Sequence, residues 1–374
     1  MKLLQKLIAR KFLLYKAPIK VASILIVKTS SLGDIIQAMP VVQDLRCRFP
    51  EVLIDWAVEA SWAPIVAAHP YVRKAIALHL KAKDRAIWKS LRVLRENRYD
   101  LVLDLQGNCK SGLVTLLSRS PVKVGFAFQS VREWPNILAT NIRFNVSKKL
   151  PIRDYYQALV ERYFRSSVTP SFEGVRFAIS PQERERISEI IAPLSHSKKM
   201  MVCAGSYWKN KRLPVSTLGT LLCKIQTRTH ATFLLVWGNA FELQECQRLA
   251  KIVGSNCVVL EHLSIPMWQN LMAEMDLVIA VDSGALHLCS TTSTPSFSIF
   301  GPTSASIFKP QGPQHIAFQG ACPYGHKFDK QCPYLRSCPS GACTQNIQIE
   351  ELYTNEFESW FLAPRKLAAF AYHK

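Results

Sequence analysis

The sequence of 374 residues contains no long apolar run, no low-complexity tract and no short-period repeat. Its best apolar run, around residues 24–27, has the length of a β-strand, whereas a membrane-spanning helix needs about 18 to 20 apolar residues. This absence argues against an integral membrane protein. Hydrophobic residues make up 48 % of the chain and charged residues 20 %, which excludes disordered, collagen-like and mucin-like chains. At roughly 150 residues per domain, the length predicts two domains.

Acidic residues are also scarce, because 27 Asp and Glu stand against 47 Lys and Arg, which gives a formal net charge of +20. The imbalance is concentrated in residues 1–165, which carry 28 basic and 12 acidic side chains, against 19 and 15 in the remainder. A field of this strength predicts an anionic partner such as nucleic acid, acidic lipid or a charged substrate. Nucleic acid is disfavoured, since aromatic residues do not alternate with the basic ones and no nucleic-acid motif occurs.

Residues 1–20 contain six Lys and Arg and no acidic residue, and their apolar residues recur every three or four positions. This pattern predicts a basic amphipathic helix that lies on an anionic membrane surface. A cleaved secretory signal fits poorly, because Arg10 and Lys11 interrupt the apolar stretch and no small-residue cleavage site follows. A mitochondrial presequence and a surface helix docked on the fold remain alternatives.

The eleven cysteines do not require disulfides. Without a secretory signal a reducing compartment is expected, and seven of them lie in apolar or helical stretches, where a free cysteine behaves as a small hydrophobic residue. The other four are Cys322, Cys332, Cys338 and Cys343, with His326 nearby. Their spacing lacks the paired C-x2-C pattern of zinc knuckles, so reduced structural cysteines are favoured over a zinc site.

Short apolar runs alternate with helical stretches in two consecutive parts of the chain. The first part predicts strands at residues 23–27, 52–58, 74–78, 100–105 and 122–126 and a helix at 153–164; the second predicts strands at 199–203, 232–237, 257–260, 277–281 and 295–300 and an amphipathic helix at 349–361. This alternation indicates βαβ units with parallel sheets, and hence an α/β protein with two Rossmann-like halves.

The stretch of Ser, Pro and Thr at residues 166–173 is expected to be a linker. The predicted organisation is therefore an N-terminal helix at 1–20, a first domain at 21–172 and a second domain at 173–374. Because open parallel sheets bind ligands at the carboxyl ends of their strands, the expected active site is a cleft between the two domains.

The first predicted strand is followed by Lys-Thr-Ser-Ser-Leu-Gly-Asp, residues 28–34. Gly33 is expected to permit a tight turn, and Ser30 and Ser31 provide hydroxyl and N–H donors before a helix that runs to about residue 48. Asp34 has two interpretations. It is either a helix-capping residue, worth about 1 kcal/mol, or a general base at the mouth of the first strand.

Two strand ends in the second part carry residues that suit a phosphate. Asp282-Ser-Gly-Ala-Leu-His287 follows the strand at 277–281, and small residues at such a turn allow backbone N–H groups to approach a phosphate. His287 either reaches that phosphate or stays on the helix surface. Ser206 and Lys211 follow the strand at 199–203 and are expected to hold a diphosphate, the alternative being a solvated basic loop before a helix that starts near residue 214.

Residues 24–36 resemble the N-terminal signature of glycosyltransferase family 9, and within it that of the lipopolysaccharide heptosyltransferases. Residues 99–111 (YDLVLDLQGNCKS) are similar to the family's "YD…D.QG..KS" stretch, residues 125–133 to its "G…Q..RE" stretch, residues 281–287 (VDSGALH) to its "VDTGLSH" nucleotide-site motif, and residues 211–214 (KRLP) to its "K.WP". The motifs keep their order over residues 22–303, so the resemblance covers most of the chain.

This resemblance implies a GT-B fold, in which two Rossmann-like domains face a central cleft and the C-terminal helix crosses back to the first domain. It implies an inverting transfer of L-glycero-D-manno-heptose from ADP-heptose to a 3-deoxy-octulosonic acid residue of the lipid A inner core, in lipopolysaccharide core biosynthesis. It also implies a peripheral protein at the cytoplasmic face of the bacterial inner membrane. The alternatives are another family 9 transferase with a different donor or acceptor, and a non-catalytic protein that binds an anionic glycolipid.

Matched position by position, the resemblance makes Asp34 the base that takes the proton of the acceptor hydroxyl. Lys211 would neutralise the departing ADP, so that no metal cofactor is expected. The implied donor site comprises Ser206, Trp237, Gly238, Glu242, Asp282, Ser283, Gly284 and His287. The implied acceptor site comprises Ser30, Ser31, Gly33, Lys81, Lys83, Arg85 and Arg132, whose basic members would meet the acidic glycolipid.

One position departs from the family pattern. Where relatives often have a glutamate that contacts the ribose, an ungapped match places Ala240. Glu242 could take over that contact only if the loop shifts, so the identity of the donor stays open.

Overall fold

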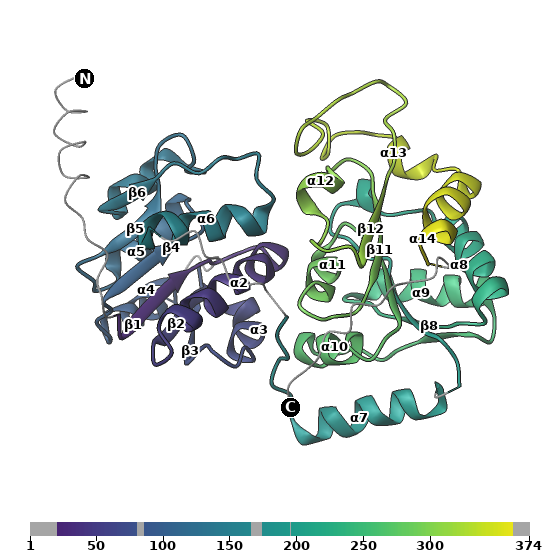
Figure 1. The fold of residues 1–374 in the computed structure, drawn as a ribbon, viewed down its shortest axis with the longest axis horizontal. Helices are drawn as coiled ribbons and strands as arrows, with labels where there is room; N and C mark the ends of the chain where they lie inside the picture. The colour runs from purple at the N-terminus through teal and green to yellow at the C-terminus, as the bar shows by residue number, and fades with distance from the viewer. Residues whose placement is uncertain (1–20, 81–85, 166–173, 195, 362–374) are drawn as a thin grey trace. The chain divides into compact units, whose positions relative to one another are not determined.

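The computed structural model describes residues 21–80, 86–165, 174–194 and 196–361. The chain divides into two compact units (Figure 1). The first unit comprises Met1–Glu189, Ser264–Ala273 and Ser290–Ser293, and the second comprises Ile190–Leu263, Glu274–Cys289 and Thr294–Lys374. The helix expected at residues 1–20, the linker at 166–173 and the domain boundary placed within it lie outside the described residues.

The first unit is built on a six-stranded sheet in the order β3-β2-β1-β4-β5-β6, with every neighbouring pair parallel. Its strands are β1 (Ser23–Val27), β2 (Leu53–Glu59), β3 (Lys74–Leu78), β4 (Leu101–Asp104), β5 (Lys123–Phe126) and β6 (Ile142–Phe144). Strands β1, β2 and β4 are buried on both faces, which explains why they read as continuous apolar runs in the sequence. The strand order reverses between β1 and β4, so the carboxyl ends of these two strands mark the expected ligand position.

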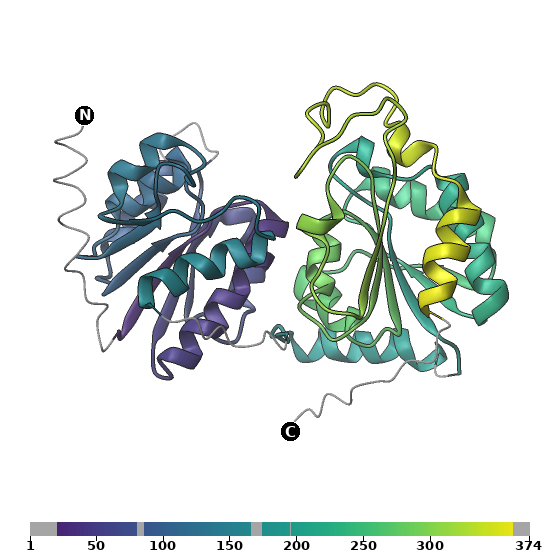
Figure 2. The same ribbon diagram turned by 45° about the horizontal axis from the view of Figure 1, so that its top comes forward.

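Helices cover both faces of this sheet. They are α2 (Leu32–Arg48), α3 (Ala63–Ala67), α4 (Ala86–Arg92), α5 (Cys109–Leu117) and α6 (Ile152–Phe164), together with the 3-10 helix η3 (Trp134–Ala139). On one face Val27 and Val102 pack with Leu91 of α4 and Val114 of α5. Helices α2 and α6 lie side by side (Figure 2), and the buried stripe of α6 includes Tyr156.

The second sheet repeats the topology of the first. Its order is β12-β11-β10-β7-β8-β9, again with every neighbouring pair parallel. Its strands are β7 (Lys199–Cys203), β8 (Thr232–Leu235), β9 (Cys257–Val259), β10 (Leu277–Val281), β11 (Ser296–Phe300) and β12 (His315–Gln319). Here the order reverses between β7 and β10, which carry the two phosphate-compatible segments at their carboxyl ends.

The remaining helices connect and cover this sheet. They are α7 (Pro181–Ile191), α8 (Val215–Thr229), α9 (Ala240–Val253), α10 (Ile265–Met272), α11 (Gly284–Cys289), α12 (Ala305–Phe308), α13 (Ala342–Gln345), a π-helix (Glu351–Glu358) and α14 (Ser359–Phe361). Helices α8 and α9 and the π-helix share one core with β7, β10 and β11. Helix α10 belongs to the first unit, where it packs against α3.

The predicted α/β class is confirmed, and each of the ten predicted strands forms within a few residues of its expected position. The sixth strand of each sheet was missed. β6 has three half-buried residues, including Arg143, and β12 begins with His315, so neither presents an apolar run. The helix at residues 349–361 forms, and Leu352 and Phe357 bury it in the core of the second unit. A segment that crosses back to the first domain would lie beyond residue 361, outside the described residues.

Within the described ranges, no helix has both the length and the apolar character that a membrane crossing requires.

Candidate active site

Asp34 lies in the first turn of α2, directly after the end of β1. Its Oδ2 accepts the Ser31 N–H at 3.3 Å, which is one of the two contacts of the capping box of the helix, and also accepts the Ser31 hydroxyl at 3.1 Å. Asp34 therefore does act as a capping residue of α2. The side chain is nevertheless 30 % exposed, so one carboxylate makes the cap and also faces solvent at the mouth of β1. This exposure leaves room for a reacting hydroxyl.

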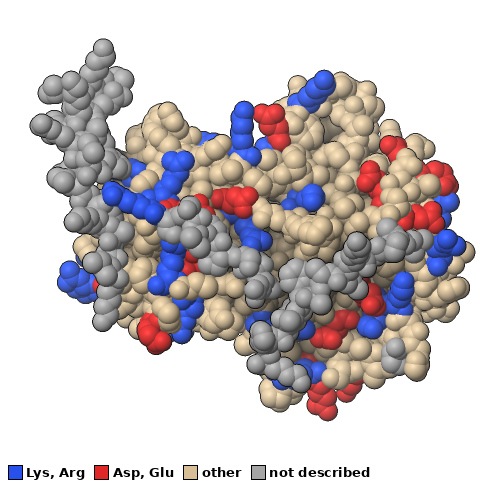
Figure 3. All heavy atoms as spheres, viewed as in Figure 1, with Lys and Arg blue, Asp and Glu red and all other residues tan. Residues whose placement is uncertain are grey.

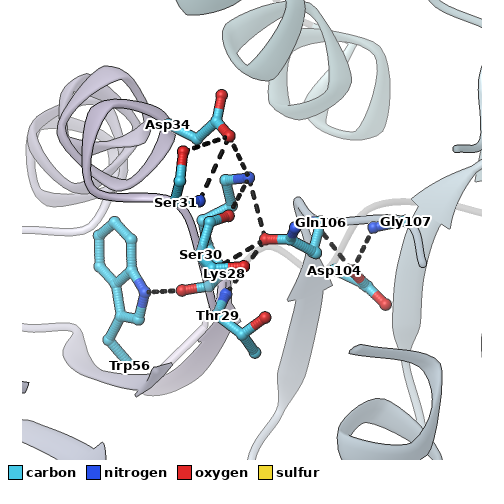
Figure 4. Close-up of polar contacts among 9 residues, drawn as sticks. All are labelled: Lys28, Thr29, Ser30, Ser31, Asp34, Trp56, Asp104, Gln106 and Gly107. Carbon is cyan, nitrogen blue, oxygen red and sulfur yellow. Dashed lines mark hydrogen bonds and ion pairs between the residues drawn. The ribbon is translucent and has the colours of Figure 1, made fainter. Parts of the chain in front are cut away.

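A buried lysine stands behind this carboxylate (Figure 4). Lys28 follows β1, and only 2 % of its side chain is exposed. Its Nζ donates to the Ser30 carbonyl and to Gln106 Oε1, both at 2.9 Å, and lies 3.8 Å from Asp34 Oδ2. Gln106 Oε1 also accepts the backbone N–H groups of Thr29 and Ser30. The end of β4 thus fixes the backbone that follows β1.

Asp104 holds the Gln106 turn in place. It is fully buried, and its Oδ1 accepts the N–H groups of Gln106 and Gly107. Its Oδ2 accepts from Ser111, Thr115 and Asn136, at 3.0, 3.1 and 2.7 Å. Gly107 has a φ of +69°, and an added Cβ would lie 3.3 Å from Phe126. This turn therefore requires both the buried carboxylate and the glycine.

Two more groups of the first unit belong to this region: Tyr156, whose pKa responds to the charge of Asp34, and Arg132, whose charge also acts on Tyr156. Tyr156 of α6 is buried, and its ring lies 5.2 Å from Lys28 Nζ. Burial, followed by the charge of Asp34, raises the pKa of Tyr156 well above its usual range, and Arg132 opposes this rise. Arg132 is exposed, and its N–H donates to the Gly107 carbonyl. The described part of the predicted acceptor site thus includes a partly exposed carboxylate, Asp34, and an exposed guanidinium, Arg132.

The prediction that Gly33 forms a tight turn is wrong, because Gly33 is the second residue of α2 and has helical backbone. Ser31 donates to the Asp34 carboxylate, whereas Ser30 contacts Lys28 and Gln106 through its backbone. Lys81, Lys83 and Arg85 lie outside the described residues.

The second unit carries an ion pair at the ends of β7 and β10. Lys211 Nζ lies 2.6 Å from Asp282 Oδ2, with side-chain exposures of 15 % for the lysine and 5 % for the aspartate. The buried Thr303 donates to the same oxygen at 2.5 Å. The Ser206 hydroxyl donates to the Asp282 carbonyl at 3.3 Å. The alternative of a solvated basic loop is therefore wrong, since Ser206 is buried and Lys211 is held by Asp282.

The segment after Asp282 adds two further polar groups. The Ser283 hydroxyl is buried, and no hydrogen bond to it occurs among the residues that the structure describes. Gly284 begins α11, and His287 lies one turn into it. His287 is buried rather than on the helix surface, with Nε2 3.9 Å from Asp282 Oδ1. Ser283 therefore offers an unused donor to a ligand at this strand end.

Glu242 reaches the ends of two strands from the first turn of α9. Its Oε2 accepts the Gly238 N–H at 2.8 Å, and a Cβ on Gly205 would lie 2.5 Å from its carboxylate. Ala240 is the first residue of this helix. The Trp237 indole does not point to a phosphate, because its Nε1 donates to the Leu260 carbonyl at 2.7 Å. A carboxylate is thus present at this strand end although Ala240 is not acidic.

A long irregular loop holds the segment that carries Lys211. Asn210 Nδ2 donates to the carbonyls of Leu335 and Cys338 at 3.0 and 3.1 Å, and the Thr344 hydroxyl donates to the Asn210 carbonyl. The same loop contains Cys322, Cys332 and Cys338, which line one cavity together with His326 and with Cys343 of α13. All eleven cysteines are free thiols. Nowhere in the described ranges do three or more His, Cys, Asp or Glu side chains form a group that could hold a metal ion.

The charge distribution differs between the units (Figure 3). Lys and Arg predominate on the visible face of the first unit, whereas the second unit shows acidic and basic side chains together. This agrees with the excess of basic residues counted in residues 1–165.

Residues 87–337 match glycosyltransferase family 9 (heptosyltransferase). The chain belongs to this family. It is 32 % identical over 292 residues to lipopolysaccharide heptosyltransferase 1 of Campylobacter coli, covering 75 % of this chain and 84 % of the relative. It is 30 % identical over 325 residues to the protein of the same name from Pseudomonas aeruginosa, covering 83 % and 87 %. A structure of the E. coli heptosyltransferase WaaC with ADP superposes with a TM-score of 0.68 at 25 % identity, covering 79 % of this chain and 92 % of that one.

This family 9 member is therefore a glycosyltransferase with the α/β fold of the GT-B heptosyltransferases. The residues that sequence reasoning missed are Lys28, Gln106 and Thr303. Lys28 and Gln106 stand within quoted family motifs, but nothing in the sequence shows that the ammonium is buried and meets both Gln106 and Asp34. Thr303 is twenty-one residues from Asp282, and only the parallel pairing of β10 with β11 brings the two together.

Proposed function

We propose that this glycosyltransferase moves L-glycero-D-manno-heptose from ADP-heptose to a 3-deoxy-octulosonic acid residue of the lipid A inner core, with inversion. The relatives named lipopolysaccharide heptosyltransferase 1 support the sugar and the pathway, and the ADP-bound neighbour supports the nucleotide. The observation that carries the proposal is Asp34, a partly exposed carboxylate fixed at the mouth of β1 by Ser31 and Lys28.

Asp34 would act as the general base of a single displacement. An acceptor hydroxyl attacks the anomeric carbon of the donor, its proton passes to Asp34, and the bond between that carbon and the ADP oxygen breaks. Proton transfer to a positioned carboxylate contributes about 10²- to 10⁴-fold to such a rate. Attack from the face opposite to the leaving group gives inversion.

Lys211 would stabilise the charge that develops on the departing ADP. Its ammonium is held by Asp282 and is 15 % exposed, so it keeps a path to a ligand. The unused Ser283 hydroxyl provides a second donor on the same strand edge. Fixed donors and a cation can supply the stabilisation for which other transferases use a metal, and we propose that transfer needs no metal ion. Activity that persists in the presence of a metal chelator is the expected result.

Glu242 supports an adenosine donor, because it places a carboxylate over Gly205 and Gly238. A carboxylate there could accept hydrogen bonds from ribose hydroxyls, as the family glutamate would. Ala240 favours the second candidate, a family 9 enzyme that uses a different donor. The substitution Glu242→Gln separates the two, since we expect it to raise the KM for the donor and leave the KM for the acceptor unchanged.

The basic first unit suits a phosphorylated and carboxylated acceptor. Arg132 is exposed, and residues 81–85 add three more basic side chains in the sequence. We assign these four residues to the acceptor site. We also assign the acid-free residues 1–20 to peripheral contact with the anionic cytoplasmic face of the bacterial inner membrane.

A donor screen against a lipid A precursor that bears octulosonic acid tests the central proposal. ADP release should occur with ADP-heptose and depend on the acceptor, and NMR of the product should show the inverted anomeric configuration. Turnover with a different nucleotide sugar, and none with ADP-heptose, would establish the second candidate.

Vesicle binding tests the membrane assignment. Removal of residues 1–18 should weaken binding to vesicles that contain an anionic phospholipid, in a salt-sensitive manner, and leave activity on a soluble acceptor intact. Equal binding with and without these residues would refute the assignment.

A further inference from the structure

Lys28 is an unusual residue in the first unit because its ammonium is almost completely buried. Lysine is rarely buried unless its charge is compensated, since removing an ammonium from water costs several kcal/mol. The ammonium has two neutral acceptors, the Ser30 carbonyl and Gln106 Oε1, both at 2.9 Å. The charge itself is complemented by Asp34 Oδ2 at 3.8 Å (Figure 4).

The two neutral contacts do not require a charge. An uncharged amide could donate to the same carbonyls without the cost of burying an ammonium. Asp34 complements the positive charge; it is more exposed than Lys28 and faces solvent at the mouth of β1. The face of the Tyr156 ring, 5.2 Å from Nζ, adds a cation–π contact to the same ammonium.

We propose that Lys28 is the positioning residue of Asp34: it holds the carboxylate at the mouth of β1 and favours the ionised form that accepts a proton. The inference rests on the proposed role of Asp34 as the base. Lys28 stays protonated throughout, and the proton moves only from the acceptor hydroxyl to Asp34. Once Asp34 is neutral, the adjacent ammonium favours release of that proton to water through the exposed side of the carboxyl group. The base is then restored for the next turnover.

The fall of kcat/KM at low pH is expected to reflect protonation of Asp34, and the groups around it determine at which pH that fall occurs. Asp34 forms an ion pair with Lys28 after β1 and interacts with Tyr156 of α6, on which the charge of Arg132 after β5 also acts. Tyr156 stays neutral, because burial raises its pKa well above its usual range. Lys28 is fully buried and in ion-pair contact with Asp34.

The test measures kcat/KM as a function of pH for Lys28→Gln and Lys28→Met, with ADP release as the readout of turnover. Gln keeps N–H donors for the two carbonyls and removes the charge, whereas Met removes both. We expect both variants to move the acid limb upward by about one pH unit, which is up to tenfold in kcat/KM below the limb. Met should also lower the rate at every pH, because Gln106 and Ser30 lose their donor.

Lys123→Met is the matched control. Lys123 is a half-buried lysine of the same unit, with Nζ donating to the Leu116 carbonyl, but it lies at the amino end of β5, on the opposite edge of the sheet. Its removal should leave the acid limb in place. Circular dichroism at each pH confirms that the variants are folded.

A second readout does not depend on activity. In protein with 13C-labelled aspartate carboxyls, the Asp34 signal is assigned by its absence in Asp34→Asn, and the midpoint of its titration is measured with and without Lys28→Gln. A midpoint that rises by about one pH unit supports the inference. An unchanged midpoint overturns it, even if Asp34→Asn is inactive. Full activity of Asp34→Asn would instead overturn the proposed base while leaving the electrostatic coupling measurable.

Discussion

Each unit places one aspartate–lysine pair at the carboxyl edge of its sheet, and the two pairs are inverted. In the first unit the lysine is buried, with 2 % exposure, and the aspartate is 30 % exposed. In the second unit the aspartate is the buried partner, with 5 % exposure, and the lysine is 15 % exposed. The same strand order thus presents a carboxylate in one unit and an ammonium in the other.

The difference shows how one topology can serve two halves of a transfer reaction. A partly exposed carboxylate with a buried cation behind it suits removal of a proton, and a partly exposed ammonium with a buried anion behind it suits stabilisation of a phosphate. The contacts differ accordingly. Lys28 lies 3.8 Å from Asp34, whereas Lys211 lies only 2.6 Å from Asp282. The looser pair leaves the carboxylate available, and the tighter pair fixes the ammonium.

The largest expected effect comes from removing the exposed carboxylate. Asp34→Asn keeps an oxygen that can accept from Ser31, so the cap of α2 survives, but it removes the base. We expect kcat to fall by about 10²- to 10⁴-fold, while ADP affinity by calorimetry stays unchanged. A rate within tenfold of the wild type would refute the role assigned to Asp34.

Removal of the exposed ammonium should have the next largest effect. Lys211→Met leaves the departing ADP without its cation, and we expect kcat to fall by about 10²- to 10³-fold, together with weaker ADP binding. Lys224→Met is the control in the same unit, since Lys224 pairs with Glu350 on the surface at 2.7 Å. Such an exposed pair is worth about 0 to 1 kcal/mol, and its loss should leave kcat unchanged. Equal effects of the two substitutions would contradict the comparison.

The units should also differ in acid sensitivity, through His69 of the first unit. Burial lowers the pKa of His69 to about 4, from the usual value of 6.5, so protonation opposes folding. The free energy of unfolding that depends on a neutral His69 is fully present above pH 6.5, and it is lost as the pH falls toward 4. Linkage gives a loss of about 2 kcal/mol between pH 7.5 and pH 5.

The control for this effect is His69→Asn. The Nδ1 of His69 accepts the Tyr71 N–H at 3.2 Å, and the asparagine oxygen can replace this acceptor. Urea unfolding of the variant at pH 7.5 and pH 5 should lack the 2 kcal/mol difference. If the variant loses as much stability as the wild type, another group carries the acid sensitivity.

The smallest effect is expected where the irregular loop meets the Lys211 segment. Asn210→Ala removes the bonds to the carbonyls of Leu335 and Cys338 and leaves the charges in place. Each such bond is worth about 1 kcal/mol, so a loosened Lys211 should lower kcat by roughly three- to tenfold. Steady-state kinetics at saturating donor measures this change in kcat. An unchanged kcat would show that Asp282 alone positions the lysine.

The sequence predicted the sheets well because strands buried on both faces read as apolar runs. β1 and β10 are such runs, whereas the edge strands β6 and β12 carry Arg143 and His315 and gave no signal. The pattern of residues 28–34 could not decide between a cap and a base at Asp34, and the structure shows why: the carboxylate makes the cap bonds and stays exposed.

The inverted pairs could not be predicted, because burial of a long side chain depends on tertiary contacts. A lysine after a strand is ordinarily a surface charge. Lys28 is buried because β4 places Gln106 beside it and α6 places Tyr156 over it. Asp282 is buried because β11 leads to Thr303, whose hydroxyl meets its carboxylate. Neither neighbour is near in the sequence.

Both partners of each aspartate–lysine pair belong to the same unit. The two units can therefore change independently during evolution. The first pair is encoded by residues 28–34 with Gln106, and the second by residues 206–211 with Asp282 and Thr303. A recombination event that joined the first unit of one family member to the second unit of another would keep both pairs intact. New combinations of acceptor and sugar donor could therefore arise by exchange of whole units, without rebuilding either charge pair residue by residue.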